Sequence, residues 1–138
     1  MRKPIIVGNW KMNKTIAEAV EFINAVDEKV HDGATYGIAT SFLALNEANK
    51  LAKNLIVAAE NCHFKDSGAY TGEVSVPMLE EIGVKWCIIG HSERRQMFNE
   101  NDEELNLKVK RLIEAEMTPI FCIGETEAQY DAGETENV

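Results

Sequence analysis

The sequence predicts a parallel α/β fold built from repeated strand–helix units, and two observations support this prediction. Five short apolar runs end abruptly in polar residues, at Asn9, Thr40-Ser41, Glu60-Asn61, His91 and Glu125. Segments with the spacing of amphipathic helices separate these runs. Strands that alternate with helices pair in parallel, so their polar ends collect at one rim of the sheet. The chemistry of the protein is therefore expected at that rim.

The strands are short and largely apolar, as expected where helices cover a sheet or where strands line a barrel. They are expected at Ile5–Asn9, Tyr36–Thr40, Leu55–Ala59, Trp86–Gly90 and Ile120–Ile123. Thr118-Pro119 stops the helix before the fifth strand, because proline cannot continue a helix.

Four main helices are expected between the strands. Thr15-Ile16-Ala17-Glu18 has the form of a capping box and begins the first helix. The second runs from Phe42 to Ala52, Pro77 lies in the first turn of the third, and Asn101 begins the fourth. The residues expected on their apolar faces are, in chain order, Ile16, Ala19, Val20, Ile23 and Val26; Leu43, Ala48 and Leu51; Met78, Leu79 and Ile82; Leu105, Val109, Leu112 and Ile113.

Two segments do not fit the strand–helix pattern. Residues Asn61 to Ser75 form the longest irregular segment, which is rich in turn residues and contains the exposed Tyr70. The tail from Glu125 to Val138 is acidic and has too few apolar residues to close a core.

Length and charge exclude several classes of protein. A chain of 138 residues has the length of one domain, here expected to span residues 1–138. The net charge of −9 argues against nucleic acid and anionic membranes as partners, because both would repel the chain. The apolar run near the N-terminus is too short to predict a signal peptide, and no apolar run is long enough to predict a membrane span. The three irregularly spaced cysteines are typical of the reducing cytosol. We therefore expect a soluble cytoplasmic protein.

Neither a metal site nor a nucleotide site emerges from the spacing of residues. Cys87 and His91 lie four apart on one strand, but with Cys62 and His63 they make no ligand set of normal spacing. Cys122 lies in an apolar strand and is expected to be a small core residue. The absence of Gly-rich phosphate-binding motifs weakens the doubly wound nucleotide-binding alternative. The pattern itself leaves a doubly wound sheet and part of a barrel both open.

The most specific segment is Gly90-His91-Ser92-Glu93-Arg94-Arg95, at the end of the fourth strand. Ser92 is expected to cap a helical turn whose free N–H groups lie beside His91. The amino end of a helix disfavours positive charge, so the imidazole is expected to be neutral near pH 7 and able to polarise a carbonyl by donating a hydrogen bond. The alternative is an ordinary capped helix with an ion-paired Glu93 and a structural His91.

A second polar group follows the first strand, at Asn9-Trp10-Lys11. The ammonium of Lys11 suits an anionic substrate, because it is a point charge with three donors. The alternative is a surface lysine that follows a turn.

Taken together, these motifs resemble the triosephosphate isomerases. The resemblance is carried, in the order of that family, by Asn9-Trp10-Lys11, Ala59-Glu60-Asn61, Tyr70-Thr71-Gly72-Glu73-Val74-Ser75, Gly90-His91-Ser92-Glu93-Arg94-Arg95 and Thr118-Pro119-Ile120-Phe121-Cys122-Ile123-Gly124-Glu125-Thr126. It implies an incomplete TIM (β/α)8 barrel of about five strands. It also implies isomerisation of dihydroxyacetone phosphate to glyceraldehyde 3-phosphate through an enediol(ate), in glycolysis and gluconeogenesis, by a homodimer without a cofactor.

The resemblance also implies a role for each matched residue. Asn9 and Lys11 would contact the substrate, His91 would be the neutral electrophile, and Glu93 would organise Lys11. Ser92 would lie next to the resting catalytic base. Thr71 would insert into a partner subunit, and Glu73 and Arg94 would form an ion pair between subunits.

Two features depart from the family pattern. Thr40-Ser41 stands where the family often has prolines, which affects only the shape of that loop. The family's base glutamate, mobile lid and phosphate-gripping loops follow the fifth strand, and neither Glu60 nor Glu125 stands in the base's place. We therefore expect an N-terminal part of the enzyme, inactive alone. The alternative is an inert, self-associating half-barrel whose inner face, including Ile56, Ala58, Ile88 and Cys122, lacks an opposite wall.

Overall fold

The computed structural model describes all 138 residues and contains one five-stranded parallel sheet. The strands are β1 (Ile5–Asn9), β2 (Thr35–Thr40), β3 (Ile56–Ala59), β4 (Trp86–Ile89) and β5 (Thr118–Phe121). They lie in the order β1-β2-β3-β4-β5, so every strand pairs with its neighbour in the sequence. The predicted parallel α/β organisation is therefore confirmed.

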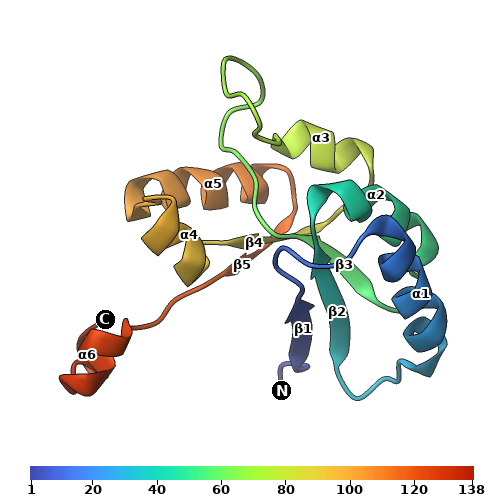
Figure 1. Ribbon diagram of the computed structural model, residues 1–138, viewed down its shortest axis with the longest axis horizontal. Coiled ribbons are helices and arrows are strands. Elements are labelled where there is room, and N and C mark those ends of the chain that lie inside the picture. The colour runs from blue at the N-terminus through green and yellow to red at the C-terminus, as the bar shows by residue number, and fades with distance from the viewer.

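The helices are α1 (Ile16–Val26), α2 (Phe42–Leu51), α3 (Val76–Glu81), α4 (Ser92–Met97), α5 (Asp102–Glu114) and α6 (Glu127–Asp131). Single 3₁₀ turns follow at Asp27–Lys29 and Thr135–Asn137. Figure 1 shows a strongly curved sheet with α1, α2, α3 and α5 along its outer side. A doubly wound sheet would carry helices on both faces. The curvature of this sheet, with helices on its outer side, therefore indicates part of a barrel. No helix combines the length and the apolar character needed to cross a membrane.

The main core lies between the outer face of the sheet and these helices. It contains 15 buried residues, among them Ile38, Val57 and Ile89 from strands and Leu45 and Leu112 from helices. The side chains that alternate with these strand residues face the inside of the curve. The outer face therefore supplies most of the burial in this chain.

The inner face is better covered than the sequence suggested. Ala58 is fully buried and Ile88 is only 5% exposed, although we expected both to lack an opposite wall. Curvature brings Ala39, Ala58 and Ile88 together, and partly buried neighbours from the flanking strands surround them. Among the strand residues, the exposed large apolar side chains lie at the two ends of the sheet, as Ile5 and Ile6 on β1 and Phe121 on β5.

Some predicted helix faces were wrong. Leu43, Met78 and Ile113 were expected to face the core, but they are 84%, 53% and 59% exposed. In α2 the buried residues are Ala44, Leu45 and Ala48. Ile16, the first residue of α1, is also exposed, whereas Ala19 and Ile23 are buried. The buried face of each helix thus combines alanines, which let the helix approach the sheet closely, with one large aliphatic side chain, Ile23 in α1 and Leu45 in α2.

The fifth strand begins two residues earlier than predicted. The backbone N–H of Thr118 donates to the carbonyl of Lys85 at 2.8 Å, which starts the pairing with β4. Pro119 is tolerated because β5 is the last strand of the sheet, where one missing N–H need not break a ladder.

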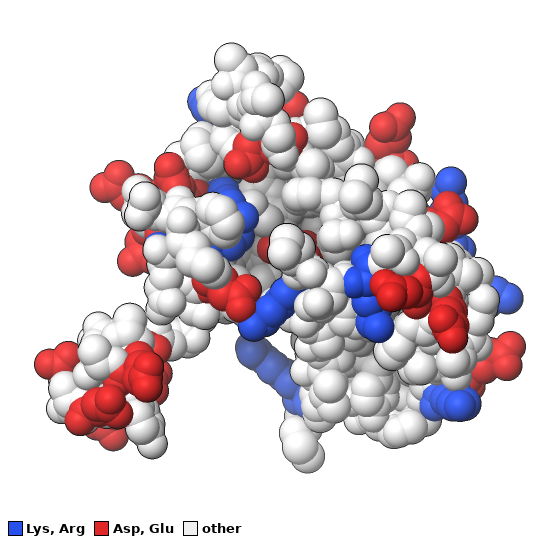
Figure 2. All heavy atoms as spheres, in the orientation of Figure 1, with Lys and Arg blue, Asp and Glu red and all other residues white.

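The acidic tail forms α6, a helix that the sequence did not predict. A capping box between Thr126 and Gln129 begins it, and it contains no buried residue. In Figure 1 it extends away from the sheet, and Figure 2 shows acidic side chains gathered on it. The tail therefore adds nothing to the core, as its composition predicted.

Candidate active site

Polar residues from three strand ends meet at the carboxyl rim of the sheet. Asn9 ends β1, while Glu60 and His91 follow β3 and β4. They line a cleft of about 430 Å³, together with Lys11 and Glu93 from the adjoining loop and helix. The structure thus brings into one cleft the residues that the first and fourth strand motifs supplied.

Lys11 is held in the cleft at its backbone and at its side chain. Its φ angle of +56° lies in the left-handed region, which is uncommon for a residue with a Cβ atom. The backbone N–H donates to Oδ1 of Asn9 at 3.1 Å, and the Nζ donates to Oε1 of Glu93 at 2.5 Å. The hydrogen bond from Lys11 lowers the pKa of Glu93. A strained backbone and a charged pair therefore fix the position of the ammonium.

His91, and not Ser92, caps the helix after β4. The predicted capping serine is the first residue of α4, and Nδ1 of His91 accepts the N–H of Glu93 at 3.1 Å. A ring nitrogen that accepts an N–H carries no proton, so the neutral ring has its proton on Nε2. Nδ1 of His91 is therefore an acceptor in this geometry, and the neutral state of the ring stays a prediction. Ser92 is exposed beside it.

Gly90 is required where the chain turns from β4 to His91. Its φ angle is +76°, and an added Cβ would lie 3.0 Å from Nη2 of Arg95 and 3.1 Å from Leu105. Arg95 donates from Nε to the Gly90 carbonyl at 2.8 Å and from Nη2 to the Cys122 carbonyl at 3.1 Å. Arg95 therefore joins the ends of β4 and β5 behind His91.

A buried ionic network lies beside the cleft. Lys108 is 4% exposed and donates to Oδ1 of Asn61 at 2.9 Å, with Oε2 of Glu100 at 3.4 Å. The same carboxylate accepts a hydrogen bond from Nε of Arg94. The sequence analysis did not predict this network. The signal was present, because Lys108 lies between Leu105 and Leu112 on the buried face of α5, and a lysine at such a position is expected to be buried.

The residues predicted to meet a partner subunit lie in or near the long loop. Thr71 and Glu73 are exposed, and Glu73 forms no ion pair within the chain. Arg94, predicted to pair with Glu73 of another subunit, pairs here with Glu100. The pair between subunits stays a prediction.

Glu60 is the other residue whose importance the sequence did not reveal. Its Oε1 is buried and has no hydrogen-bond partner. Desolvation raises the pKa of Glu60 to about 7, the backbone N–H of Lys11 acts against this shift, and the charge of Glu93 adds to it. The sequence places Glu60 at the rim, but the missing partner follows only from the packing.

The cysteines form no cluster with other ligand types. Cys62 and Cys87 are buried side by side, and Cys122 is partly buried. Burial raises the pKa of the Cys87 thiol well above its usual value, so that thiol is a core group.

Comparisons with known proteins agree on one family. A family model described as triosephosphate isomerase matches residues 4–138. The chain is 48% identical over 141 residues to the triosephosphate isomerase of Alkaliphilus metalliredigens. This match spans 100% of the chain and 57% of the relative. It is 51% identical over 136 residues to the triosephosphate isomerase of Mycoplasma capricolum. This match spans 98% of the chain and 55% of the relative. The chain thus spans little more than half the length of the curated relatives it matches.

Proposed function

The chain belongs to the triosephosphate isomerase family, and we propose that its cleft binds and polarises a phosphorylated triose during the interconversion of dihydroxyacetone phosphate and glyceraldehyde 3-phosphate. The observation that carries the proposal is the arrangement of Lys11, Glu93 and His91 in one cleft at the carboxyl rim. Both the fold and the family associate this rim with catalysis.

Each residue contributes a defined part of the chemistry. The ammonium of Lys11 stabilises the negative charge of the substrate and of the enediolate, and Glu93 holds the ammonium in place. Nε2–H of His91 donates to the substrate oxygens and polarises the carbonyl. Asn9 orients the backbone of Lys11 and lies beside the substrate. Removal of the proton next to the carbonyl also needs a base, and neither Glu60 nor Glu125 stands in the family's place for it.

The proposal is tested by completing the site. The chain is mixed with the part of the Alkaliphilus metalliredigens relative that it does not cover, and turnover of glyceraldehyde 3-phosphate is measured. We expect no useful turnover from the chain alone and measurable turnover from the mixture. Lys11→Met should lower that turnover by about 10²–10³-fold, the cost of removing one preorganised electrostatic group.

Lys14→Met is the matched control, because Lys14 is also an exposed lysine with a positive φ angle in the same loop. Its Nζ lies over the ring of Trp10, 5.4 Å from the centroid, and pairs with no carboxylate. Equal losses in the two variants would contradict a specific role for Lys11. Turnover by the chain alone, abolished by His91→Ala, would show that a base lies within these 138 residues.

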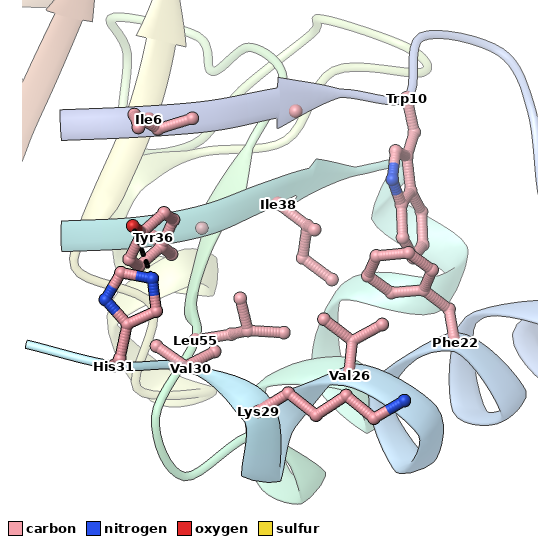
Figure 3. A pocket seen from close by; sticks show the side chains of 12 residues that line it. Ile6, Trp10, Phe22, Val26, Lys29, Val30, His31, Tyr36, Ile38 and Leu55 are labelled. Carbon is pink, nitrogen blue, oxygen red and sulfur yellow. Dashed lines mark hydrogen bonds between the residues drawn. The ribbon is translucent and has the colours of Figure 1, made fainter. Parts of the chain in front are cut away.

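We also propose that the chain associates through the open end of its sheet. Ile5 and Ile6 of β1 are more than half exposed, and a groove of about 350 Å³ opens beside them between the sheet and α1. Figure 3 shows Trp10 and Phe22 at one end of this groove, edge to face with centroids 5.1 Å apart, and Tyr36 hydrogen-bonded to His31 at the other. An apolar strand with an unpaired edge favours pairing with another chain.

The long loop supplies a second candidate contact, in a homodimer. Thr71 and Glu73 project from an exposed loop and are free to meet another subunit. Glu73→Arg should weaken dimerisation of the completed protein in sedimentation velocity, whereas Glu103→Arg on the exposed side of α5 should not. An unchanged dimer would exclude Glu73 from the interface. Three free cysteines and the family role in glycolysis support a cytoplasmic location for the protein.

A further inference from the structure

The backbone groups at the open edge of β1 can be identified from its pairing with β2. The carbonyl of Pro4 accepts a hydrogen bond from the β2 side, and the N–H of Trp10 donates one to it. Because alternate residues of a parallel strand bond to the same neighbour, Ile5, Val7 and Asn9 direct their N–H and C=O groups away from β2. No strand lies on that side, so these backbone groups have no partner in the sheet.

The open edge of β5 differs because it begins with a proline. The N–H groups of Thr118 and Cys122 donate to carbonyls on the β4 side. Pro119, Phe121 and Ile123 therefore face away from β4, where the sheet ends. Proline has no N–H, so this edge begins with an acceptor alone. A strand that pairs with it must supply a donor for the carbonyl of Pro119.

Both edges carry a large apolar side chain on the outer face of the sheet. Ile6 is 55% exposed and lies beside the groove drawn in Figure 3, and Phe121 is 45% exposed. The residues that alternate with them, Val7 on β1 and Ile120 and Cys122 on β5, pack against the small inner cluster. The two edges therefore divide their side chains between the faces in the same way, and parallel pairing of the two strands preserves this division.

The charges that flank the two edges are of opposite sign. Arg2 and Lys3 precede β1 and Lys14 follows it, and all three are exposed. Glu116 precedes β5 and Glu127 follows it, and both are exposed. Pairing of two β1 edges would bring cations together, and pairing of two β5 edges would bring carboxylates together. Parallel pairing of a β1 edge with a β5 edge brings opposite charges together at both rims.

We propose that the β5 edge of a second copy of the chain occupies the β1 edge, in a parallel head-to-tail arrangement with Ile6 opposite Phe121. The N–H of Ile5 then donates to the carbonyl of Pro119, and the N–H of Phe121 donates to the carbonyl of Ile5. The N–H of Val7 donates in turn to the carbonyl of Phe121. The missing N–H of Pro119 falls before the first residue of β1, so no group of β1 loses a donor.

Other registers satisfy the two edges less well. A shift of two residues that places Phe121 opposite Gly8 leaves the carbonyl of Ile5 facing the nitrogen of Pro119, without a donor. A shift of two residues in the other direction separates Phe121 from Ile6. A shift of one residue would exchange the inner and outer faces of one strand.

This inference names the partner in the association proposed above and rests on that proposal. A head-to-tail contact leaves one β1 edge and one β5 edge free in every open assembly, so assemblies grow with concentration until a ring closes. Neither Ile6 nor Phe121 lines the cleft, so the contact is tested on the full chain without substrate.

Exchange of charges tests the direction of the contact. Lys3→Glu and Glu116→Lys each place like charges at the amino rim of the contact, so each should weaken self-association about fivefold in sedimentation velocity at low salt. An equimolar mixture of the two variants should associate as strongly as the wild type, because every contact between unlike chains then joins opposite charges. Lys50→Glu on α2 and Glu81→Lys on α3 make the same changes of charge at exposed positions and are the controls.

A pair of cysteines tests the register. Ile6→Cys and Phe121→Cys are made in separate chains that also carry Cys122→Ser, since the remaining native cysteines are buried. Directly opposed residues of paired strands lie about 4.8 Å apart, within the range that a disulfide spans. Treatment of the mixed chains with diamide should give a covalent dimer on non-reducing electrophoresis, and neither chain alone should give one.

Several results would overturn the proposal. A covalent dimer of Ile6→Cys chains alone would show that two β1 edges pair, and assemblies that give no covalent dimer in the mixture would exclude this register. Charge variants that associate like the wild type on their own would exclude the charge complementarity. A chain that stays monomeric at every concentration would refute the proposed association as a whole. The proposed catalytic role fails separately, if the completed protein shows no turnover.

Discussion

The ammonium of Lys11 and the carboxylate of Glu93 lie 2.5 Å apart although 82 residues separate them in the sequence. Lys11 follows β1 and Glu93 follows β4, with β2 and β3 between these strands. In a flat sheet, three strand spacings would place the two ends about 14 Å apart. The curl of the sheet shortens this separation, so the pair agrees with the barrel-like geometry.

We predict that Glu93→Gln releases Lys11 without unfolding the chain. The ammonium then loses its charged acceptor, and turnover in the completed protein should fall by about 10²-fold, as expected for a misplaced catalytic group. Glu103→Gln, an exposed first-turn residue of α5, is the control. Wild-type turnover in Glu93→Gln would mean that the backbone of Lys11 alone positions the ammonium.

The Glu93 pair also gives a pH dependence with a definite sign. Lys11 lowers the pKa of Glu93 below the usual value of 4.5. A lowered folded-state pKa stabilises the fold above the unfolded pKa, and this stabilisation is lost as pH falls through the folded value. The difference in melting temperature between wild type and Glu93→Gln should therefore shrink below about pH 4.5. A difference that grew on acidification would contradict the pairing.

Asp27 should be a strong determinant of stability far from the cleft. It is buried at the end of α1, and its carboxylate accepts the backbone N–H groups of Lys53, Asn54 and Leu55 at 2.9–3.2 Å. Burial opposes the charge, but these donors outweigh it and lower the pKa of Asp27. Asp27→Asn should cost about 1–3 kcal/mol in urea unfolding at pH 7, because donors lose a charged acceptor.

The cost of Asp27→Asn should begin to shrink as pH falls below about 3.8, the ordinary value, and should be lost as pH falls through the lowered pKa of the folded-state carboxylate. Asp32→Asn changes an exposed aspartate after the same helix and is the control. Because association makes unfolding midpoints depend on protein concentration, all variants should be compared at one concentration. A cost that did not shrink on acidification would locate the effect in packing and not in charge.

Lys108→Met should also be destabilising, by about 3 kcal/mol in the same urea assay. The substitution leaves the buried Glu100 with Arg94 alone and removes the donor to Asn61. Breaking a buried charge pair from one side typically costs about 3–5 kcal/mol, and the remaining arginine favours the lower end. Lys110→Met, on the exposed side of α5, should be neutral. A neutral Lys108→Met would mean that water satisfies Glu100.

We expect the isolated chain to self-associate. Sedimentation velocity over a hundredfold range of concentration should show growing assemblies, because the outer strands carry unpaired N–H and C=O groups beside exposed Ile5, Ile6 and Phe121. Addition of the complementary part of a relative should convert them to a discrete species. A cooperative transition of a monomer, independent of concentration, would show that the chain protects these edges.

The sequence predicted the strand–helix repeat because both of its periodicities are local. The capping box at Thr15 and the start of α5 after Asn101 follow from side chains that contact the nearest N–H groups. The failures involve distant contacts. Leu43 was assigned to the core together with Ala48, but only Ala48 is buried, and Ala44 and Leu45 face the sheet in place of Leu43.

The same distinction between local patterns and distant contacts applies to the candidate site. The motifs around Lys11 and His91 identified the family, so the role of Glu93 could be predicted through the resemblance. The cap formed by His91, the burial of Lys108 and the unpartnered oxygen of Glu60 depend on how three strand ends converge. Such convergence is set by the curvature of the sheet, which no local pattern encodes.

The strand order also has a consequence for how the chain is made. Each strand of the sheet pairs with the strand synthesised just before it, so no strand waits for a distant partner. On the ribosome, β2 can pair with β1 while the later residues are still being added, and each further unit extends the same edge. The growing edge stays open throughout translation, so the nascent chain is most vulnerable to pairing with a neighbouring nascent chain. Arrest at residue 60 and at residue 125, followed by limited proteolysis, should show protection that advances from the N-terminus.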